Sequence, residues 1–188
     1  MTTRTVRLGP LSVKMYCAIG MIAVSWAQLE DMVSLCISRL LGTDHTDFLP
    51  IASNMQVKAR FDALKAIANL RLPADEAKAL IARCDEALEL GRERNKILHG
   101  SWIQGETDDV AIRLNYRAHG RVSANAPVIS AREIAEISDR ITMLTEGFAQ
   151  ILQRLGLLDP KNPMRSPARG AGGAGGDGGG KPREAVED

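Results

Sequence analysis

The stretch that decides the fold runs from Pro73 to Gly100, PADEAKALIARCDEALELGRERNKILHG. Apolar residues recur in it at steps of three and four, as on one face of an amphipathic helix. Pro73 suits the first turn of that helix, the acidic residues after it suit its positive end, and Gly100 can end it. The same steps then lead from apolar to polar positions. The apolar positions are Ala77, Ile81, Cys84 and Leu88, and the polar positions are Arg92, Asn95 and His99.

The polar end of this predicted face needs an explanation. At ~100° per residue, its three polar positions lie within an arc of about 60° centred near Leu88. Polar side chains are costly to bury unless they are paired, so this end of the face is a candidate functional surface or subunit interface. There is also a structural interpretation. Arg and His in a last helical turn complement the helix dipole, and Asn95 could be one satisfied buried amide.

These residues also carry a family resemblance. Arg94-Asn95-x-x-x-His99 resembles the R-x4-6-H signature of HEPN domains, in which a polar residue, often Asn, follows the Arg. Gly100 and Trp102 after the motif resemble members of this group, as does Trp26-Ala27-Gln28-Leu29-Glu30 on a long first helix. The resemblance covers roughly residues 12–155. It implies a small helical bundle, and many HEPN domains are ribonucleases that need no metal ion.

The resemblance implies roles for the motif residues, with no metal or other cofactor. His99 would act as general base or general acid, since the ordinary pKa of imidazole lies near ~6.5. Asn95, one turn earlier, would orient the imidazole. An arginine would stabilise the charged phosphate, because guanidinium donates two hydrogen bonds and keeps its charge. The family pattern favours Arg94 for this role, whereas helical geometry favours Arg92, seven residues before His99 and nearly in line with it.

The resemblance further implies a homodimer, because HEPN enzymes bring two motifs together across one cleft. Many act as toxins or antiphage defence effectors, which would make RNA the substrate and an antitoxin or regulatory protein a further partner. Two other functions stay open at this point. One is a non-catalytic module of the same fold that binds RNA, a nucleotide or a protein. The other is a helical dimeric interaction protein.

The whole sequence predicts an all-α fold, a helical bundle of about four long helices with a small β-hairpin inserted before the last one. A capping box at Ser130 and Glu133 marks the start of that last helix. Thr46 to Ile51, with Pro50 inside, predicts at best a short helical turn, and Ser53 or Asn54 can cap the helix that follows. The predicted long helices cover about 12–41, 73–99 and 131–155, and the helix after Ser53 or Asn54 carries an apolar stripe at Val57, Phe61, Leu64 and Ile67.

Residues 101–129 lose the helical period. Val110, Ile112, Leu114 and Tyr116 alternate with polar or small residues, which predicts a strand; its partners are expected at Trp102-Ile103 before it and Arg121-Val122 after it. Arg113, Arg117 and Arg121, with Tyr116 and His119, could contact a phosphate backbone from this hairpin. A solvated strand face is the alternative.

Composition sets the outer limits. The net charge is +1, so an RNA-binding surface would have to be a local basic patch. The three cysteines are widely spaced, and we expect Cys36 and Cys84 to be reduced core thiols. Glu86, Glu89 and Glu93 share a helix face with basic neighbours, which indicates solvated ion pairs rather than a metal site.

Domain limits and location follow from the remaining patterns. We expect a flexible arm at 1–10, a helical domain at 11–158 and a disordered Gly/Pro-rich tail at 159–188. Arg4 and Arg7 precede an uncharged run from Met15 to Leu29, which outlines a signal peptide. Its helical stripe, however, continues in phase beyond any cleavage point, and the run is short for a membrane span of ~20 residues. We therefore expect a cytoplasmic protein with no membrane partner.

Overall fold

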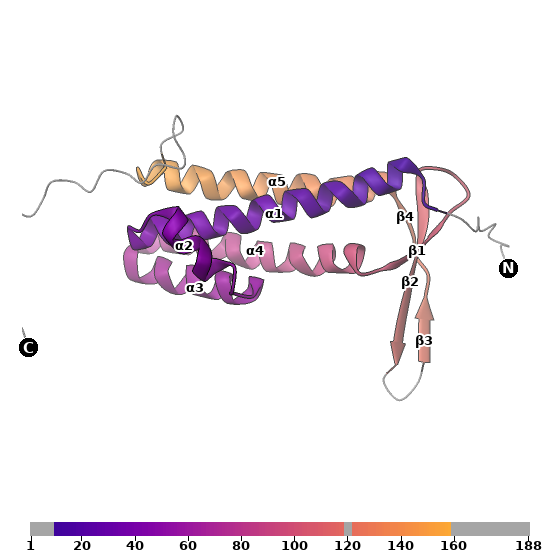
Figure 1. Ribbon diagram of the computed structural model, residues 1–188, viewed down its shortest axis with the longest axis horizontal. Helices are drawn as coiled ribbons and strands as arrows, with labels where there is room; N and C mark the ends of the chain where they lie inside the picture. Colours follow the sequence, from indigo (N-terminus) through magenta and orange to yellow (C-terminus); the bar gives the residue numbers. More distant parts are fainter. Residues whose placement is uncertain (1–9, 119–121, 159–188) are drawn as a thin grey trace, which may run out of the picture.

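The computed structural model describes residues 10–118 and 122–158, and the predicted tail and all but the last residue of the predicted arm lie outside this part. The described chain is mostly helical, with a small antiparallel sheet at one end of the helices (Figure 1). This confirms the predicted fold class in its broad form. The helices are α1 (Val13–Leu41), α2 (His45–Ala52), α3 (Val57–Arg71), α4 (Ala74–Leu98) and α5 (Ala131–Arg154). The strands are β1 (Ser101–Gln104), β2 (Val110–Ala118), β3 (Val122–Asn125) and β4 (Val128–Ser130).

Helix α1 has the limits that the sequence predicts. The side chain of Ser12 accepts a hydrogen bond from the backbone N–H of Met15 and caps the start of the helix. Gly42 ends it with φ +68°, in the left-handed region that glycine adopts at little cost. The apolar stripe faces inward and includes Met15, Ile22, Trp26, Leu29 and Val33, all of which are buried.

The segment between α1 and α3 differs from the prediction. A complete helix, α2, covers His45–Ala52 where we expected at most one turn, and it contains Pro50. Ser53 and Asn54 do not cap α3. Their side chains donate hydrogen bonds to the carbonyl of Pro50 instead. Buried Phe48 and Ala52 anchor α2 to the core, so tertiary packing compensates for a proline that local propensity disfavours.

Helix α5 begins at the predicted capping box. The side chain of Ser130 accepts from the backbone N–H of Glu133, and the Glu133 carboxylate accepts from the backbone N–H of Ser130. These backbone and side-chain hydrogen bonds hold the pKa of Glu133 below its ordinary value. The apolar stripe of α5 is buried at Ile134, Ile141, Leu144, Phe148 and Ile151.

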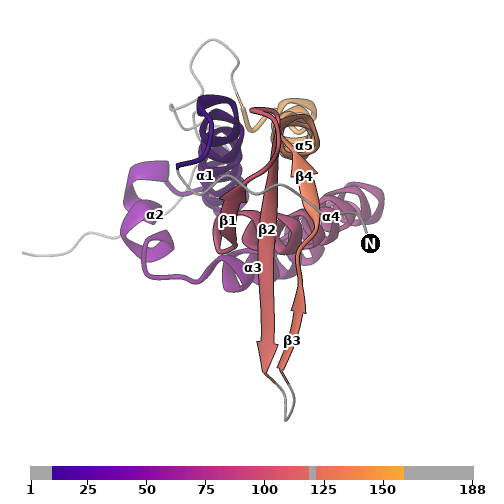
Figure 2. The same cartoon turned by 90° about the vertical axis from the view of Figure 1, so that its right-hand side faces the viewer.

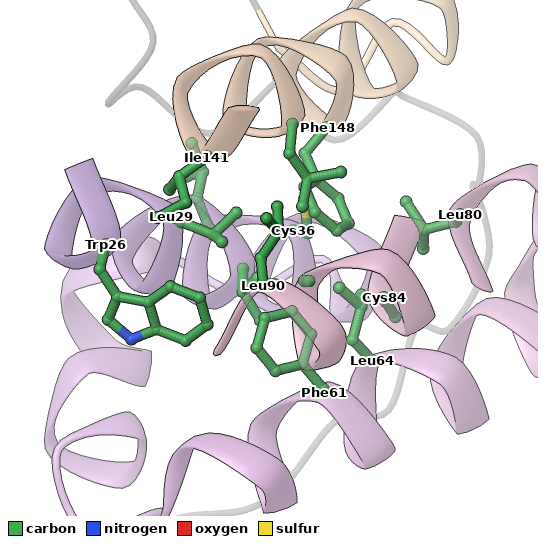
Figure 3. Close-up of a cluster of buried hydrophobic side chains, with 14 of the residues drawn as sticks. Trp26, Leu29, Cys36, Phe61, Leu64, Leu80, Cys84, Leu90, Ile141 and Phe148 are labelled. Atoms are coloured by element: carbon green, nitrogen blue, oxygen red, sulfur yellow. The ribbon is translucent and has the colours of Figure 1, made fainter. Parts of the chain in front are cut away.

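The core lies where α1 meets α5 on one side and α3 and α4 on the other. Figure 3 shows its centre, with side chains from all four of these helices turned toward one another. A buried hydrogen bond of 3.1 Å between the hydroxyls of Ser25 and Ser138 joins α1 to α5 within this packing. No helix of the described residues is long and apolar enough to cross a membrane.

The sheet extends the predicted hairpin. Strand β2 pairs with β1, β3 and β4, all antiparallel (Figure 2). The partners expected from the sequence, Trp102-Ile103 and Val122, do pair with β2, and Trp102 lies opposite Arg113. Strand β4 was not predicted, because three residues before a helix cap carry too little pattern to read. The sheet adjoins the end of α4, where the motif lies.

Candidate functional site

The inward face of α4 is not the one that the sequence predicts. Leu80, Ala87, Leu90, Gly91 and Ile97 are buried with Ala77 and Cys84, whereas Ile81 and Leu88 are only half-buried. The helix is therefore rotated relative to the predicted stripe. As a result Arg92, Asn95 and His99 are exposed. The expectation that they finish a buried face was wrong for the single chain, and the explanation by an interface stays a prediction.

Arg94 is the motif residue that the fold holds in place. It is half-buried, and its guanidinium carbon lies 5.6 Å from the centroid of the Trp26 ring. Its Nη1 donates a hydrogen bond of 2.8 Å to Oδ1 of Asn95. Its Nε is buried and has no hydrogen-bond partner among the described residues. The guanidinium thus carries a positive charge with unused hydrogen-bonding capacity at the surface of the core.

Trp26 is held by contacts with α4 and with Glu30 of its own helix. The residue is 4% exposed, and its ring lies on Gly91 so closely that a Cβ added there would come within 2.8 Å of ring atom Cη2. Its Nε1 donates to the carboxylate of Glu30, which also pairs with Arg60 of α3 at 3.2 Å. Sequence reasoning missed the role of Gly91. The only signal was a glycine inside a helix, which costs ~1 kcal/mol relative to alanine and so often has a packing reason.

His99 and Asn95 lie at the exposed end of α4. His99 occupies the C-cap position, and its backbone N–H donates to the carbonyl of Asn95 at 3.0 Å. The side chain of Asn95 accepts from Arg94, so its described contact is with the arginine rather than with the imidazole. The structure brings Arg94 and Asn95 together and leaves His99 open to solvent one turn later.

Arg92 lies in a different environment from Arg94. Its Nη1 pairs with the Glu89 carboxylate at 2.6 Å, and the two side chains are 70% and 64% exposed. This confirms the predicted ion pair with a neighbour on the same helix for Glu89, whereas Glu93 pairs with Arg140 of α5 at 2.9 Å. Within the described residues, no group of three or more His, Cys, Asp or Glu side chains is placed to hold a metal ion.

The sheet adds a second arginine to this end of α4. Arg113 is half-buried, and its Nε is buried with no hydrogen-bond partner in the described part of the chain. It lies against Gly100, next to His99. The phosphate contact and the solvated strand face both stay predictions for Arg113. Arg117 pairs with Ser123 in the backbone register, but its side chain, like His119 and Arg121, lies outside the described residues.

The two cysteines expected in the core are there, reduced and buried, whereas Cys17 is exposed. Burial raises the pKa of the Cys84 thiol to about 12 and that of Cys36 well above its ordinary value. Neither thiol is therefore a nucleophile at neutral pH. His45, for which the sequence offered no partner, is buried at the start of α2, and its Nδ1 lies 3.4 Å from the hydroxyl of Ser38.

Comparisons of this chain with protein-family models, with curated proteins and with solved structures give no match. The candidate site therefore rests on its own residues. These are Arg94 on Trp26, Asn95 bonded to Arg94, exposed His99, and Arg113 over Gly100.

Proposed function

We propose that this chain is an endoribonuclease of the HEPN type that needs no metal ion and acts as a homodimer. The observation that supports it best is the state of Arg94, which is packed on Trp26 with its Nε buried, five residues before an exposed histidine. Holding a charged side chain in one orientation costs conformational entropy. A fixed cation is what stabilises the charge that develops on a phosphate during cleavage.

The proposed reaction uses the 2′-hydroxyl of RNA as nucleophile. His99 acts as general base or acid. A base takes the 2′-hydroxyl proton, and the 2′-oxygen attacks the adjacent phosphorus. The bond from phosphorus to the 5′-oxygen breaks, and an acid group protonates that oxygen. Arg94 stabilises the additional negative charge on the phosphate. The products are a 2′,3′-cyclic phosphate, which water can open to a 3′-phosphate, and a 5′-hydroxyl.

A second copy of the chain would complete this chemistry. One motif offers one imidazole and one fixed guanidinium, whereas the reaction needs a base, an acid and a cation. Because His99 and Asn95 are exposed, two motifs could face each other across one cleft. The second imidazole would then supply the missing acid or base.

A second candidate is a non-catalytic module of the same kind that binds RNA or a nucleotide. The hydrogen bond from Arg94 to Asn95 favours it, because it engages the side chain that would otherwise orient His99. Such a module would bind phosphate through Arg94 and would lack the general acid and general base that cleavage requires.

RNA cleavage by the full-length chain in the presence of EDTA tests the proposal. We expect cleavage of single-stranded RNA with cyclic or 3′-phosphate ends. His99→Ala should slow it by ~10²–10⁴-fold. The variant should keep its helical circular dichroism and its mass in light scattering. An unfolded His99→Ala variant would make the motif structural, and intact RNA bound to wild-type protein would favour the non-catalytic module.

A further inference from the structure

We propose that Arg113 is a second phosphate-binding residue for the same RNA strand, and that Gly100 is the position that seats it. This inference rests on the proposed function only in taking RNA as the ligand. It would assign the sheet a direct part in the site, whereas the motif residues lie on α4 and at its C-cap.

The contact between Arg113 and Gly100 places the guanidinium stem over the end of α4. A Cβ added at Gly100 would come within 2.9 Å of both Cγ and Cδ of Arg113 and of the backbone oxygen of Lys96. Such distances are too short for real contacts, so a side chain at position 100 would displace the Arg113 stem, the Lys96 carbonyl or both. Gly100 follows His99 directly in the chain, so the arginine stem lies against the residue next to the proposed acid–base residue.

The backbone of Arg113 is fixed from both sides. It lies opposite Trp102 of β1 in the ladder, and its N–H donates to the carbonyl of Pro127 at 3.0 Å. The indole of Trp102 in turn donates to the carbonyl of Ile97, in the last turn of α4, at 2.9 Å. The sheet and the helix end are therefore tied together, and Arg113 is presented by a rigid element.

The charge of Arg113 lacks a partner in the described structure. Several other described arginines pair with glutamates, namely Arg60, Arg92, Arg132, Arg140 and Arg154. No carboxylate pairs with Arg94 or Arg113 among the described residues, and each of the two has a buried Nε without a hydrogen bond. The described hydrogen bonds include none from the Arg113 side chain to a carbonyl at the end of α4, where the Ile97 carbonyl accepts from Trp102.

An RNA phosphate matches these two arginines chemically. Guanidinium binds phosphate through paired hydrogen bonds, and a nucleic-acid strand presents phosphates in series. Arg94 lies on α4 before His99, and Arg113 lies on β2 against Gly100. Together these two cations can position an RNA strand across the end of α4. Figures 1 and 2 show the β2–β3 ribbon projecting from this place away from the helices.

Binding of a short fluorescent single-stranded RNA to full-length His99→Ala protein tests the assignment without cleavage. We expect Arg113→Gln to weaken binding by about tenfold or more. It should also flatten the slope of log K against log salt by about 0.7, as for one lost phosphate contact. Arg113→Lys should keep the slope and lose part of the affinity. Arg132→Gln, which removes the same charge from an exposed ion pair on α5, is the matched control.

Gly100→Ala provides an independent variant that leaves the arginine in the chain. It should weaken RNA binding in the same direction as Arg113→Gln, because the new methyl group displaces the guanidinium stem. Circular dichroism should show both variants folded.

The possible results separate this inference from the proposed nuclease activity. An unchanged affinity and salt slope in folded Arg113→Gln would overturn the inference, even if wild-type protein cuts RNA. RNA binding that depends on Arg113, without any cleavage by wild type, would support it and reject the nuclease. Absence of RNA binding by the His99→Ala parent would overturn the inference, and cleavage by wild-type protein in EDTA would then decide the nuclease separately.

Discussion

Arg94 lies over the ring of Trp26, with 5.6 Å between its guanidinium carbon and the ring centroid. The ring in turn lies on Gly91, one turn earlier on α4, and donates to Glu30 on its own helix. The position of the motif arginine is therefore set by α1, a helix more than sixty residues earlier in the chain. This relationship makes Gly91 and Trp26 positioning residues for Arg94.

We expect Gly91→Ala to destabilise the fold by about 1–3 kcal/mol, as overpacking in a well-packed core usually does. The added methyl group would lie 2.8 Å from Cη2 of a buried indole that has no room to move. Urea unfolding followed by circular dichroism measures the change in the free energy of unfolding.

Gly20→Ala is the matched control, because nothing lies within 4 Å of a Cβ added at this position, on the exposed side of α1. It should stabilise the helix by about 0.5–1 kcal/mol. Equal effects of the two substitutions would contradict the close contact between Gly91 and Trp26.

Arg94→Ala and Arg92→Ala should differ in both stability and cleavage. Arg94 loses a partly desolvated contact with Trp26, about 0.5–2 kcal/mol, whereas Arg92 loses an exposed ion pair, about 0.3–0.5 kcal/mol. If the chain cleaves RNA, Arg94→Ala should lower the rate far more than Arg92→Ala. Single-turnover cleavage of a labelled RNA measures the two rates. A greater loss for Arg92→Ala would transfer the phosphate role to that residue.

The full-length chain should form a homodimer at micromolar concentration. Helix α1 exposes apolar side chains at Val13, Tyr16 and Val24, and the motif end of α4 is open to solvent. Exposed apolar surface of this kind often marks an interface. Light scattering should give about twice the chain mass of 20.3 kDa and about half that value for Val24→Lys. Leu70→Lys, at an exposed apolar position on α3, is the control. A monomeric wild type would exclude the composite active site.

Stability should fall as the pH is lowered through the ordinary pKa of histidine, because of His45. Burial lowers the pKa of His45 and the nearby Arg39 lowers it further, against smaller opposite effects of Asp31 and Asp44. As the pH falls through about 6.5, the unfolded chain takes up a proton that the native state does not. The contribution of neutral His45 to the free energy of unfolding is therefore complete above that pH and is lost below it. His45→Gln should flatten the pH dependence between about pH 7.5 and about pH 5.5. Chemical unfolding at both pH values measures the difference in the free energy of unfolding. If His45→Gln leaves this difference unchanged, another group is responsible for the pH dependence.

The local structure of this chain could be predicted from its sequence because the signals are short in range. Ser12 and Gly42 bound α1, and Ser130 with Glu133 opens α5, since caps act on the backbone within one turn. The alternation around Ile112 predicted β2 for the same reason.

The orientation of α4 was decided only by the tertiary structure. Both Leu88 and Leu90 fit a helical stripe in the sequence. In the structure, α4 packs against α1, α3 and α5 with Leu90 and Ile97 buried. The same holds for Gly91 and Gly100, whose missing side chains make room for Trp26 and Arg113. The sequence places the motif at the end of a helix, but which motif side chains are packed and which are exposed depends on contacts between segments far apart in the chain, because burial is a property of the assembled core.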